Sequence, residues 1–339
     1  MSIQDAIAAL INDRRDLSED EAAEAMDDVF RGEATPATLA AFLVALRMKG
    51  ETVDEIAGMA RTMREHSLRV EVEGPLLDTC GTGGDGRGTF NVSTAAAFVA
   101  AGAGARVAKH GNRAMSSACG SADVLEALGA KIDLSPEQVA QCIEEAGFGF
   151  MFAQAFHPAM KHAAPTRREL GVRTAFNLLG PLTNPAGAQH QLLGVARPEL
   201  ASLMAAALDR LGSRHVLVIH GHDGSDELTL EGPNPVYEIN RGEPEEYTID
   251  PRKLGLPTAL PNAIQGGTPE ENAKMLTALL DGETGAIRDV VLLNAAAALV
   301  AADIVPSVRD GLEAAAESID SGAGRERLTA FVNLTKTFG

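Results

Sequence analysis

From about residue 73 onward, short apolar runs alternate with helix-like segments, and this alternation restricts the possible folds more than any other feature. The apolar runs, which we read as candidate strands, are 75–79, 106–110, 148–153, 190–196 and 214–221. Helix-like stretches such as STAAAFVAAGAG, SADVLEALG, SPEQVAQCIEEAG and ELASLMAAALDRLG lie between them. Strands alternating with helices predict a largely parallel sheet flanked by helices. The polar segment 236–251 breaks the alternation, and we expect it to run antiparallel.

The beginning of the chain has a different pattern, with four helix-like segments separated by short turns. Ser18 followed by Glu21 has the spacing of a capping box, which predicts a helix start. Thr35 precedes a proline at a first-turn position, and Gly50 follows the third segment where a helix would end. These signals predict a small all-helical lobe.

Two domains follow from this change of pattern. We expect a helical domain over 1–70, joined in space by part of 157–185, and a large α/β domain over 73–339. The connection near 68–75 is the predicted hinge, and closure there would bring the two domains together over a ligand.

Composition excludes several classes of protein. The 339 residues are 45% hydrophobic and carry a net charge of −18, with a pI of about 4.8. So acidic a chain lacks the basic surface that nucleic-acid binding requires, and an anionic ligand must be held by local donors or metal. Cys80, Cys119 and Cys142 are widely spaced, which predicts packing residues in a reducing cytoplasm. The longest apolar run, 290–302, is too short to span a bilayer.

The loop after the first candidate strand is unusually rich in glycine: residues 78–94 read DTCGTGGDGRGTFNVST. Glycine in such numbers costs conformational entropy, so a ligand that must approach the main chain is a common reason for it. The order strand, glycine loop, helix start places backbone N–H groups at one sheet edge, which favours an anion. The loop matches neither the P-loop nor the Rossmann fingerprint, and a merely tight turn is the alternative.

A second polar loop, KHGNRAMSS, follows the next candidate strand. Its Lys109 and Asn112, with Ser117 and Ser121 further on, could donate to a second face of the same ligand. Loops at the carboxyl ends of neighbouring parallel strands converge on one crevice. We therefore expect one phosphate-rich ligand between the two loops, although an ordinary strand end would also explain Lys109 and His110.

Together, GTGGDGRGTFNVST and KHGNRAMSS resemble the anthranilate phosphoribosyltransferase family. HPAMKHAAPTRRELGVRTAFNLLGPLTNPA (157–186), GSDELTL (224–230) and the N-terminal helical segment resemble it as well, so the resemblance covers essentially the whole chain. It implies a small helical domain and a large α/β domain, as in nucleoside phosphorylases and phosphoribosyltransferases. It also implies an enzyme of tryptophan biosynthesis that transfers a phosphoribosyl group from phosphoribosyl pyrophosphate to the amine of anthranilate.

The resemblance assigns the phosphoribosyl pyrophosphate site to the two loops. The matching residues are Gly81, Gly84, Asp85, Thr89, Asn91, Val92, Ser93, Thr94, Lys109, His110, Gly111, Asn112, Arg113, Ala114, Met115, Ser116, Ser117 and Ser121. It assigns anthranilate to Gly81, Asn112 and Arg167, with the turn 180–185 as a wall. The chain departs from the family pattern before His157, where Phe156 stands instead of a polar residue that is often histidine. The acceptor contacts there stay open.

The resemblance also implies magnesium, held by Asp226, Glu227 and the Ser93 hydroxyl, with two ions per monomer. Hard oxygen ligands are what Mg²⁺ prefers, although in isolation two adjacent carboxylates are as often a solvated turn. His220 and His222 flank this loop, and we interpret them as structural because Mg²⁺ disfavours imidazole. No residue is singled out as a general base. A homodimer through the helical domain is implied too.

Two other functions fit parts of the pattern. A pyrimidine nucleoside phosphorylase shares the architecture but has less use for an Asp–Glu pair, and GVRTAFNLLGPLTNP favours the transferase. A relative that binds nucleic acid without catalysis would need a basic groove and would show salt-sensitive affinity. The charge of −18 argues against it.

Overall fold

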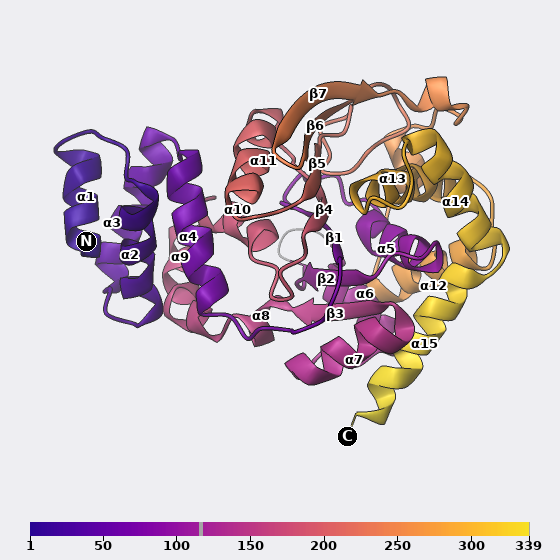
Figure 1. The fold of residues 1–339 in the computed structure, drawn as a ribbon, viewed down its shortest axis with the longest axis horizontal. Helices are drawn as coiled ribbons and strands as arrows, with labels where there is room; N and C mark the ends of the chain where they lie inside the picture. The colour runs from indigo at the N-terminus through magenta and orange to yellow at the C-terminus, as the bar shows by residue number, and fades with distance from the viewer. Residues whose placement is uncertain (115–117, 339) are drawn as a thin grey trace.

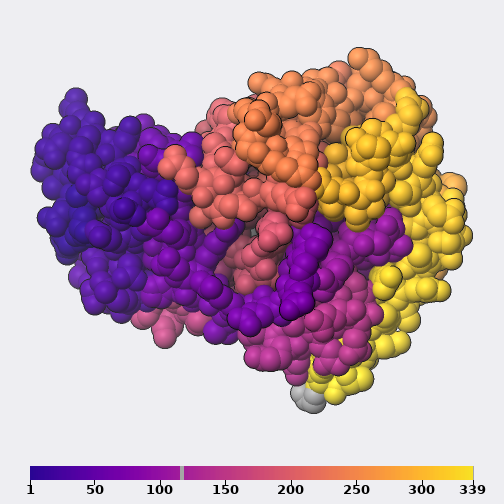
Figure 2. Space-filling model, in the orientation of Figure 1, coloured from indigo at the N-terminus to yellow at the C-terminus, as the bar shows by residue number. Residues whose placement is uncertain are grey.

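The computed structural model describes residues 1–114 and 118–338. Three residues of the predicted donor site, Met115, Ser116 and Ser117, lie outside this range. The N-terminal helices stand out to one side of a larger α/β body, and the last helix ends at the C-terminus on the lower side of that body (Figure 1). Figure 2 shows the same helices as an indigo lobe beside that body.

The lobe contains four helices: α1 (Ile3–Ile11), α2 (Glu19–Phe30), α3 (Pro36–Lys49) and α4 (Val53–Glu65). The predicted caps are confirmed, because Ser18 accepts from the backbone N–H of Glu21 and Thr35 accepts from that of Thr38. Gly50 ends α3 with a φ of 91°, a conformation that favours glycine. Local sequence signals therefore fix where these helices begin and end.

A segment from the middle of the chain shares the core of the lobe. Helix α3 packs on α9 (Ala164–Leu170), while α4 packs on α10 (Phe176–Leu179) and α11 (Ala201–Arg210). Buried side chains of 163–182, such as Phe176, join the same apolar cluster as Phe42 of α3. Burial of these side chains links the lobe to the segment that carries Arg167.

One seven-stranded sheet forms the centre of the large domain, in the order β3-β2-β1-β4-β5-β6-β7. The strands are β1 (Leu77–Gly81), β2 (Val107–Gly111), β3 (Phe148–Phe152), β4 (His190–Gly194), β5 (His215–Ile219), β6 (Asn234–Asn240) and β7 (Glu243–Ile249). The first five pair in parallel, and β6 and β7 add antiparallel strands at one edge. This confirms the mostly parallel sheet and the antiparallel excursion. Strand β1 begins two residues later than predicted, because Pro75 has no N–H for the ladder and the pairing with β2 and β4 begins at Leu77.

The two faces of the sheet contribute to different cores. Leu192 and Leu217 point into the cluster that contains α5 (Val92–Gly102) and α13 (Ala286–Ala301). The neighbouring Leu193 and Val218 point into the cluster shared with the lobe. Alternation along each strand is the cause, since successive side chains point to opposite faces.

The remaining helices belong to the large domain or to its connection with the lobe. They are α6 (Ser121–Ala127), α7 (Pro136–Ala146), α8 (Ala153–Phe156), α12 (Pro269–Leu280), α14 (Val308–Asp320), α15 (Ala323–Thr337) and five short 3₁₀ turns at Pro158–His162, Gly180–Leu182, Pro198–Leu200, Pro251–Leu254 and Pro261–Ile264. The longest apolar run lies in α13, whose residues from Val290 to Ala301 are all buried. Among the described residues, no helix combines the length and apolar character that crossing a membrane requires. All three cysteines are free, with Cys119 and Cys142 buried as expected.

Candidate active site

The glycine-rich loop leaves the carboxyl end of β1 and needs glycine for two physical reasons. Four positions have φ between +63° and +74°, a region that L side chains disfavour: Gly83, Gly84, Gly86 and Gly88. Gly81 has no such φ, but a Cβ there would press on the carboxylate of Asp226. Backbone conformation and close approach together explain the glycines, and they leave the main chain open to a ligand.

Both ends of the loop are anchored by hydrogen bonds. At its start, the N–H of Thr82 donates to the carbonyl of Gly194 at 2.9 Å. At its end, Nε2 of Gln265 donates to the carbonyl of Gly88 at 2.6 Å. These contacts come from distant parts of the chain, so the tertiary fold sets the path of the loop.

The second loop lies directly against the first, because β2 is the neighbour of β1. Nδ2 of Asn91, beside the first loop, donates to the carbonyl of Cys119 in the second at 3.1 Å. Nδ2 of Asn272 in α12 donates to Oδ1 of Asn91 at 2.8 Å and holds the amide in place. The predicted convergence of the two loops is therefore confirmed.

Lys109 of β2 places a buried amine against β1 and the start of α5, the two elements that the glycine loop connects. Its side chain is 2% exposed, and Nζ donates to the Thr79 carbonyl and lies 3.2 Å from Oγ of Ser93. Burial lowers the pKa of Lys109, while the nearby carboxylate of Asp78 opposes this shift. Such a buried amine at the strand ends is an electrostatic partner for a polyanion.

The acidic loop after β5, which carries Asp226 and Glu227, accepts hydrogen bonds from two backbone N–H groups of the 78–94 segment. Asp226 Oδ2 accepts from the N–H of Gly83 at 2.7 Å, and Glu227 Oε1 accepts from that of Ser93 at 3.2 Å. Burial raises the pKa of both carboxyls, and the negative charge of Asp85 adds to the rise at Asp226. Oδ2 of Asp85 is itself buried without a hydrogen-bond partner among the described residues. Carboxylate oxygens gathered in this way are the ligand type that a hard divalent cation prefers.

The predicted donor-site residues divide by exposure. Open or half-buried are Gly81, Gly84, Asp85, Thr89, Asn91, Ser93, Gly111, Asn112, Arg113, Ala114 and Ser121, whereas Val92, Thr94, Lys109 and His110 are buried. Arg113 is already engaged, because Nη1 lies 3.1 Å from Asp123 and 2.5 Å from Glu126. Val92 and Thr94 belong to the first turn of α5, which they help to pack.

On the acceptor side, Arg167 in α9 stacks its guanidinium over the ring of Phe176 at 5.0 Å. Stacking of this kind holds the planar fork in one orientation, as carboxylate recognition requires. Asn112 is exposed at the end of β2 and accepts from the N–H of Arg113 through Oδ1 at 2.8 Å. The structure places Arg167 and Asn112 on different elements, and the turn 180–185 lies between the lobe and the sheet.

Two histidines meet behind this turn. Nε2 of His110 lies 3.2 Å from Nε2 of His157, and Nδ1 of His110 bonds to the carbonyl of Gly180 at 3.2 Å. Burial lowers the pKa of His110 to about 3 and that of His157 to about 4, so both rings are neutral near pH 7. His220 and His222 bond through Nδ1 to the carbonyls of Val195 and Pro233, which fits a structural role.

Sequence reasoning missed three residues that contact the site. Asn272 and Gln265 hold the glycine-loop region from the far part of the chain, and no local pattern marks them. Arg173 donates from Nη1 to the carbonyl of Gly83 at 2.9 Å and lies 3.4 Å from that of Gly84. Arg173 lies just before α10, in the 157–186 segment that resembles the family. A positive charge at that position was the signal that could have identified it.

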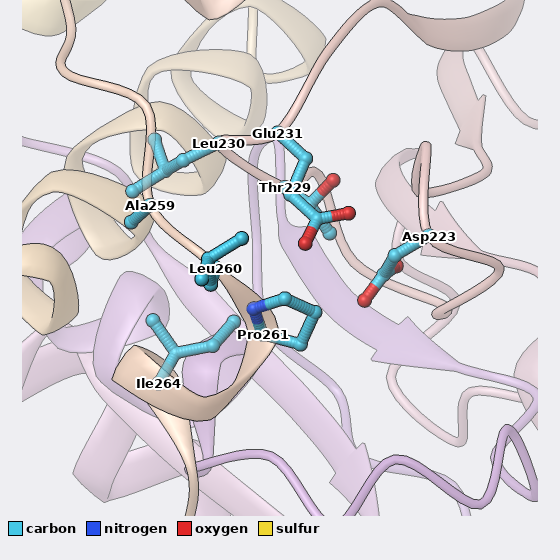
Figure 3. A pocket seen from close by; sticks show the side chains of 8 residues that line it. All are labelled: Asp223, Thr229, Leu230, Glu231, Ala259, Leu260, Pro261 and Ile264. Carbon is cyan, nitrogen blue, oxygen red and sulfur yellow. The ribbon is translucent and has the colours of Figure 1, made fainter.

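Two hollows lie in the described part of the molecule, one beside the acidic loop and one beside Arg113. Figure 3 shows the smaller hollow, of about 10 Å³. The acidic Asp223 and Glu231 line it together with the apolar Leu260, Pro261 and Ile264. That is room for about one water molecule. The larger hollow, of about 510 Å³, lies behind the second loop and is lined by Arg113, Glu126, Ala130, Lys131, Ile132, Asp133, Phe152, Gln154 and Ala155.

Comparison with known proteins adds a second line of observation. A model described as the glycosyl transferase family, helical bundle domain, matches residues 4–67, and the a/b domain of that family matches 73–325. Anthranilate phosphoribosyltransferases are 58% identical in Roseiflexus castenholzii, over 337 residues, and 56% identical in Chloroflexus aurantiacus, over 338. Both alignments cover 99% of each chain. This chain belongs to the anthranilate phosphoribosyltransferase family.

Solved structures of the family have the same fold. The anthranilate phosphoribosyltransferase of Thermus thermophilus superposes with a TM-score of 0.93 at 50% identity, covering 98% of this chain and 99% of that one. The enzyme of Saccharomyces cerevisiae in complex with phosphoribosyl pyrophosphate and Mg superposes with a TM-score of 0.92 at 29% identity, covering 99% and 98%. Membership of the anthranilate phosphoribosyltransferase family confirms the resemblance read from the two loops.

Proposed function

We infer that this chain is an anthranilate phosphoribosyltransferase. It transfers the phosphoribosyl group of phosphoribosyl pyrophosphate to the amine of anthranilate, and the products are N-(5-phosphoribosyl)anthranilate and diphosphate. This is the second step of tryptophan biosynthesis from chorismate. The observation that carries the inference is the meeting of the glycine loop, the second loop and the acidic loop at one sheet edge, in a chain 58% identical to a named member.

For the donor, we propose that the two loops hold phosphoribosyl pyrophosphate through the residues assigned by resemblance. The left-handed glycines keep the main chain uncovered, so backbone N–H groups can approach the phosphates. Lys109, buried between β1 and the start of α5, supplies positive charge where negative charge builds on the departing diphosphate. Asn91, held by Asn272, links the start of α5 to the second loop.

The acidic loop fits magnesium. Asp226 and Glu227 are carboxylates with raised pKa values that lie close to other acids, and the orphaned Oδ2 of Asp85 adds an oxygen with no partner in the described chain. We propose that Asp226, Glu227 and the hydroxyl of Ser93 hold two Mg²⁺ ions per monomer. When bound, the metal neutralises charge on the diphosphate. Among solved relatives, the Saccharomyces cerevisiae enzyme is described in complex with phosphoribosyl pyrophosphate and Mg.

For the acceptor, we propose that Arg167 grips the anthranilate carboxylate, with Asn112 and Gly81 bordering the same space. The anthranilate amine is neutral at pH 7, so attack on the anomeric carbon needs no strong base. The neutral His110 and His157 lie behind the 180–185 turn, and neither is assigned as a general base. Catalysis then consists of positioning and charge stabilisation, with displacement and inversion through an oxocarbenium-like transition state.

We also propose that two copies associate through the helical lobe in the cytoplasm. Met48 is 84% exposed and Val44 37% exposed on α3, and Ile11 on α1 is 55% exposed. These apolar side chains are uncovered on neighbouring helices, a feature typical of interaction surfaces. Closure at 68–75 is the proposed domain motion.

The decisive assay follows the fluorescence of anthranilate in the presence of phosphoribosyl pyrophosphate and Mg²⁺. Loss of the signal, dependent on all three components, is the expected result. A variant with Asp226→Asn and Glu227→Gln keeps the size of both side chains but removes their negative charges. Its turnover at limiting Mg²⁺ should fall about 100-fold relative to the wild type. Orthophosphate with a pyrimidine nucleoside tests the phosphorylase alternative. Cleavage of the nucleoside, with anthranilate untouched, would overturn the assignment.

A further inference from the structure

Arg173 is a cation without a carboxylate partner at the edge of the glycine loop. It lies in the connection between α9 and α10, and its side chain is half-buried. Nη1 reaches two successive backbone carbonyls, those of Gly83 at 2.9 Å and Gly84 at 3.4 Å. Within the described ranges, no Asp or Glu forms an ion pair with its guanidinium. Its hydrogen bonds in the described part of the chain go to the glycine loop.

Gly83 is held from both sides of its backbone. Its N–H donates to Oδ2 of Asp226 at 2.7 Å, while its carbonyl accepts from Arg173. Gly83 and Gly84 are both left-handed, with φ of 65° and 74°. Consecutive residues in this conformation have no strand or helix ladder to hold them, so side chains must fix their path. Arg173 and Asp226 do this together.

The guanidinium of Arg173 lies directly against the main chain of Gly84. A Cβ built on Gly84 would collide with Nη1 of Arg173, so a side chain there would displace the guanidinium. The arginine is itself anchored, because the N–H of the following Thr174 donates to Oδ1 of Asn177 at 2.9 Å at the start of α10. The segment that bears Arg167 is thereby connected to the donor loop.

We propose that Arg173 is a positioning residue for the donor: it holds Gly83 and Gly84 in the curvature that presents the loop to the diphosphate of phosphoribosyl pyrophosphate. This inference rests on the proposed function, since it names the substrate of that site. Arg173 acts through the loop and through Gly83 on Asp226, whose position the metal site depends on. Arginine suits this task because Nη1 carries two hydrogens whose directions the guanidinium plane fixes, one toward each of the adjacent carbonyls.

The test compares Arg173→Lys and Arg173→Gln with Arg168→Gln, an exposed arginine in α9. We expect the KM for phosphoribosyl pyrophosphate to rise about 10-fold in Arg173→Lys and further in Arg173→Gln, because a small misplacement of a binding loop is costly. The KM for anthranilate should stay within about 2-fold, and the melting temperature should match that of Arg168→Gln. A purely structural role would lower the melting temperature and the active fraction without moving this KM.

A rise confined to the anthranilate KM would overturn the proposal, since Arg173 would then contact the acceptor. An unchanged KM for both substrates would overturn it as well. A double-mutant cycle with Asp226→Asn, read as Mg²⁺-dependent affinity for phosphoribosyl pyrophosphate, tests the link through Gly83. The fold-loss of affinity in the double variant should be smaller than the product of the fold-losses in the two single variants. A fold-loss equal to that product would show that the two residues act independently and would contradict the link. If the wild-type chain itself does not bind phosphoribosyl pyrophosphate with Mg²⁺, the proposed function fails instead.

Discussion

The backbone N–H of Gly83 donates to Oδ2 of Asp226 at 2.7 Å across 143 positions of the chain. This single bond ties the glycine loop, which follows β1, to the acidic loop, which follows β5. It also means that a donor held by the first loop lies next to the carboxylates proposed to hold the metal. The position of Asp226 therefore governs both halves of the site.

Substitutions at Gly81 and Gly194 should displace Asp226 from two sides. A Cβ at Gly81 would press on the Asp226 carboxylate, which can rotate, whereas a Cβ at Gly194 would press on its backbone carbonyl, which cannot. Both Gly81→Ala and Gly194→Ala should raise the Mg²⁺ concentration needed for half-maximal rate, and Gly194→Ala by more, about 10-fold. Initial rates across a Mg²⁺ series measure this. Equal or absent effects would show that Asp226 does not set the metal affinity.

Arg167→Lys should weaken acceptor binding selectively. Lysine keeps the charge but loses the planar fork that stacks on Phe176. The KM for anthranilate should rise about 10-fold, equivalent to about 1.4 kcal/mol, while that for phosphoribosyl pyrophosphate stays the same. This is the reverse of the pattern expected for Arg173. Steady-state kinetics with each substrate varied in turn provides the comparison, and an effect on the donor KM alone would contradict the role given to Arg167.

Gly58→Ala should destabilise the helical lobe. A Cβ at Gly58 in α4 would run into the backbone carbonyl of Glu19 in α2, so the two helices would have to separate. The gain of about 1 kcal/mol in helix propensity is outweighed by this overpacking. The net loss in the free energy of unfolding should be about 2 kcal/mol, visible as a lower melting temperature in calorimetry. Glu65→Ala, at the exposed end of α4, is the control and should change little.

His215 should make the stability of the fold depend on pH. At the amino end of β5, its Nδ1 lies 2.6 Å from Asp303 Oδ1 and its Nε2 lies 2.8 Å from Glu238 Oε1. Burial alone would lower the pKa of His215, but hydrogen bonds to these two carboxylates outweigh it and raise the pKa. Tyr247 bonds to Glu238, and Arg241 bonds to Asp303, so both carboxylates are well anchored.

Because the folded-state pKa lies above the unfolded value of about 6.5, the stabilisation is complete below that pH. It is lost as the pH rises through the folded-state pKa. His215→Gln should therefore lower the melting temperature most near pH 6, by the equivalent of about 2 kcal/mol, and progressively less toward pH 9. His222→Gln, at an exposed histidine after β5, is the control. A difference between wild type and His215→Gln that does not change with pH would refute the charged state of His215.

The sequence predicts the helix starts, the strand alternation and the glycine positions because each of these depends on residues close together in the chain. Strand alternation, the caps at Ser18 and Thr35, and the φ demands on Gly83 depend on residues near them in the chain. The start of β1 was misplaced by two residues because an apolar run shows burial but does not show which N–H groups pair.

The contacts that hold the site escaped prediction because they join remote segments. Arg173 lies 90 positions from Gly83, and Asn272 lies 181 positions from Asn91. Nothing in either neighbourhood marks such a partner. The same holds for the pairing of His110 with His157, 47 positions apart, which depends on how the lobe segment folds back onto the sheet.

Every step proposed for this enzyme requires that three loops at one sheet edge hold a single phosphoribosyl pyrophosphate with the help of divalent cations. Calorimetric titration of that compound into the wild-type chain, with Mg²⁺ and again after chelation, measures this binding. We expect saturable binding at one site per chain with Mg²⁺ and affinity at least about 10-fold weaker without it. Absence of saturable heat in the presence of Mg²⁺, or equal affinity under both conditions, would refute the shared site.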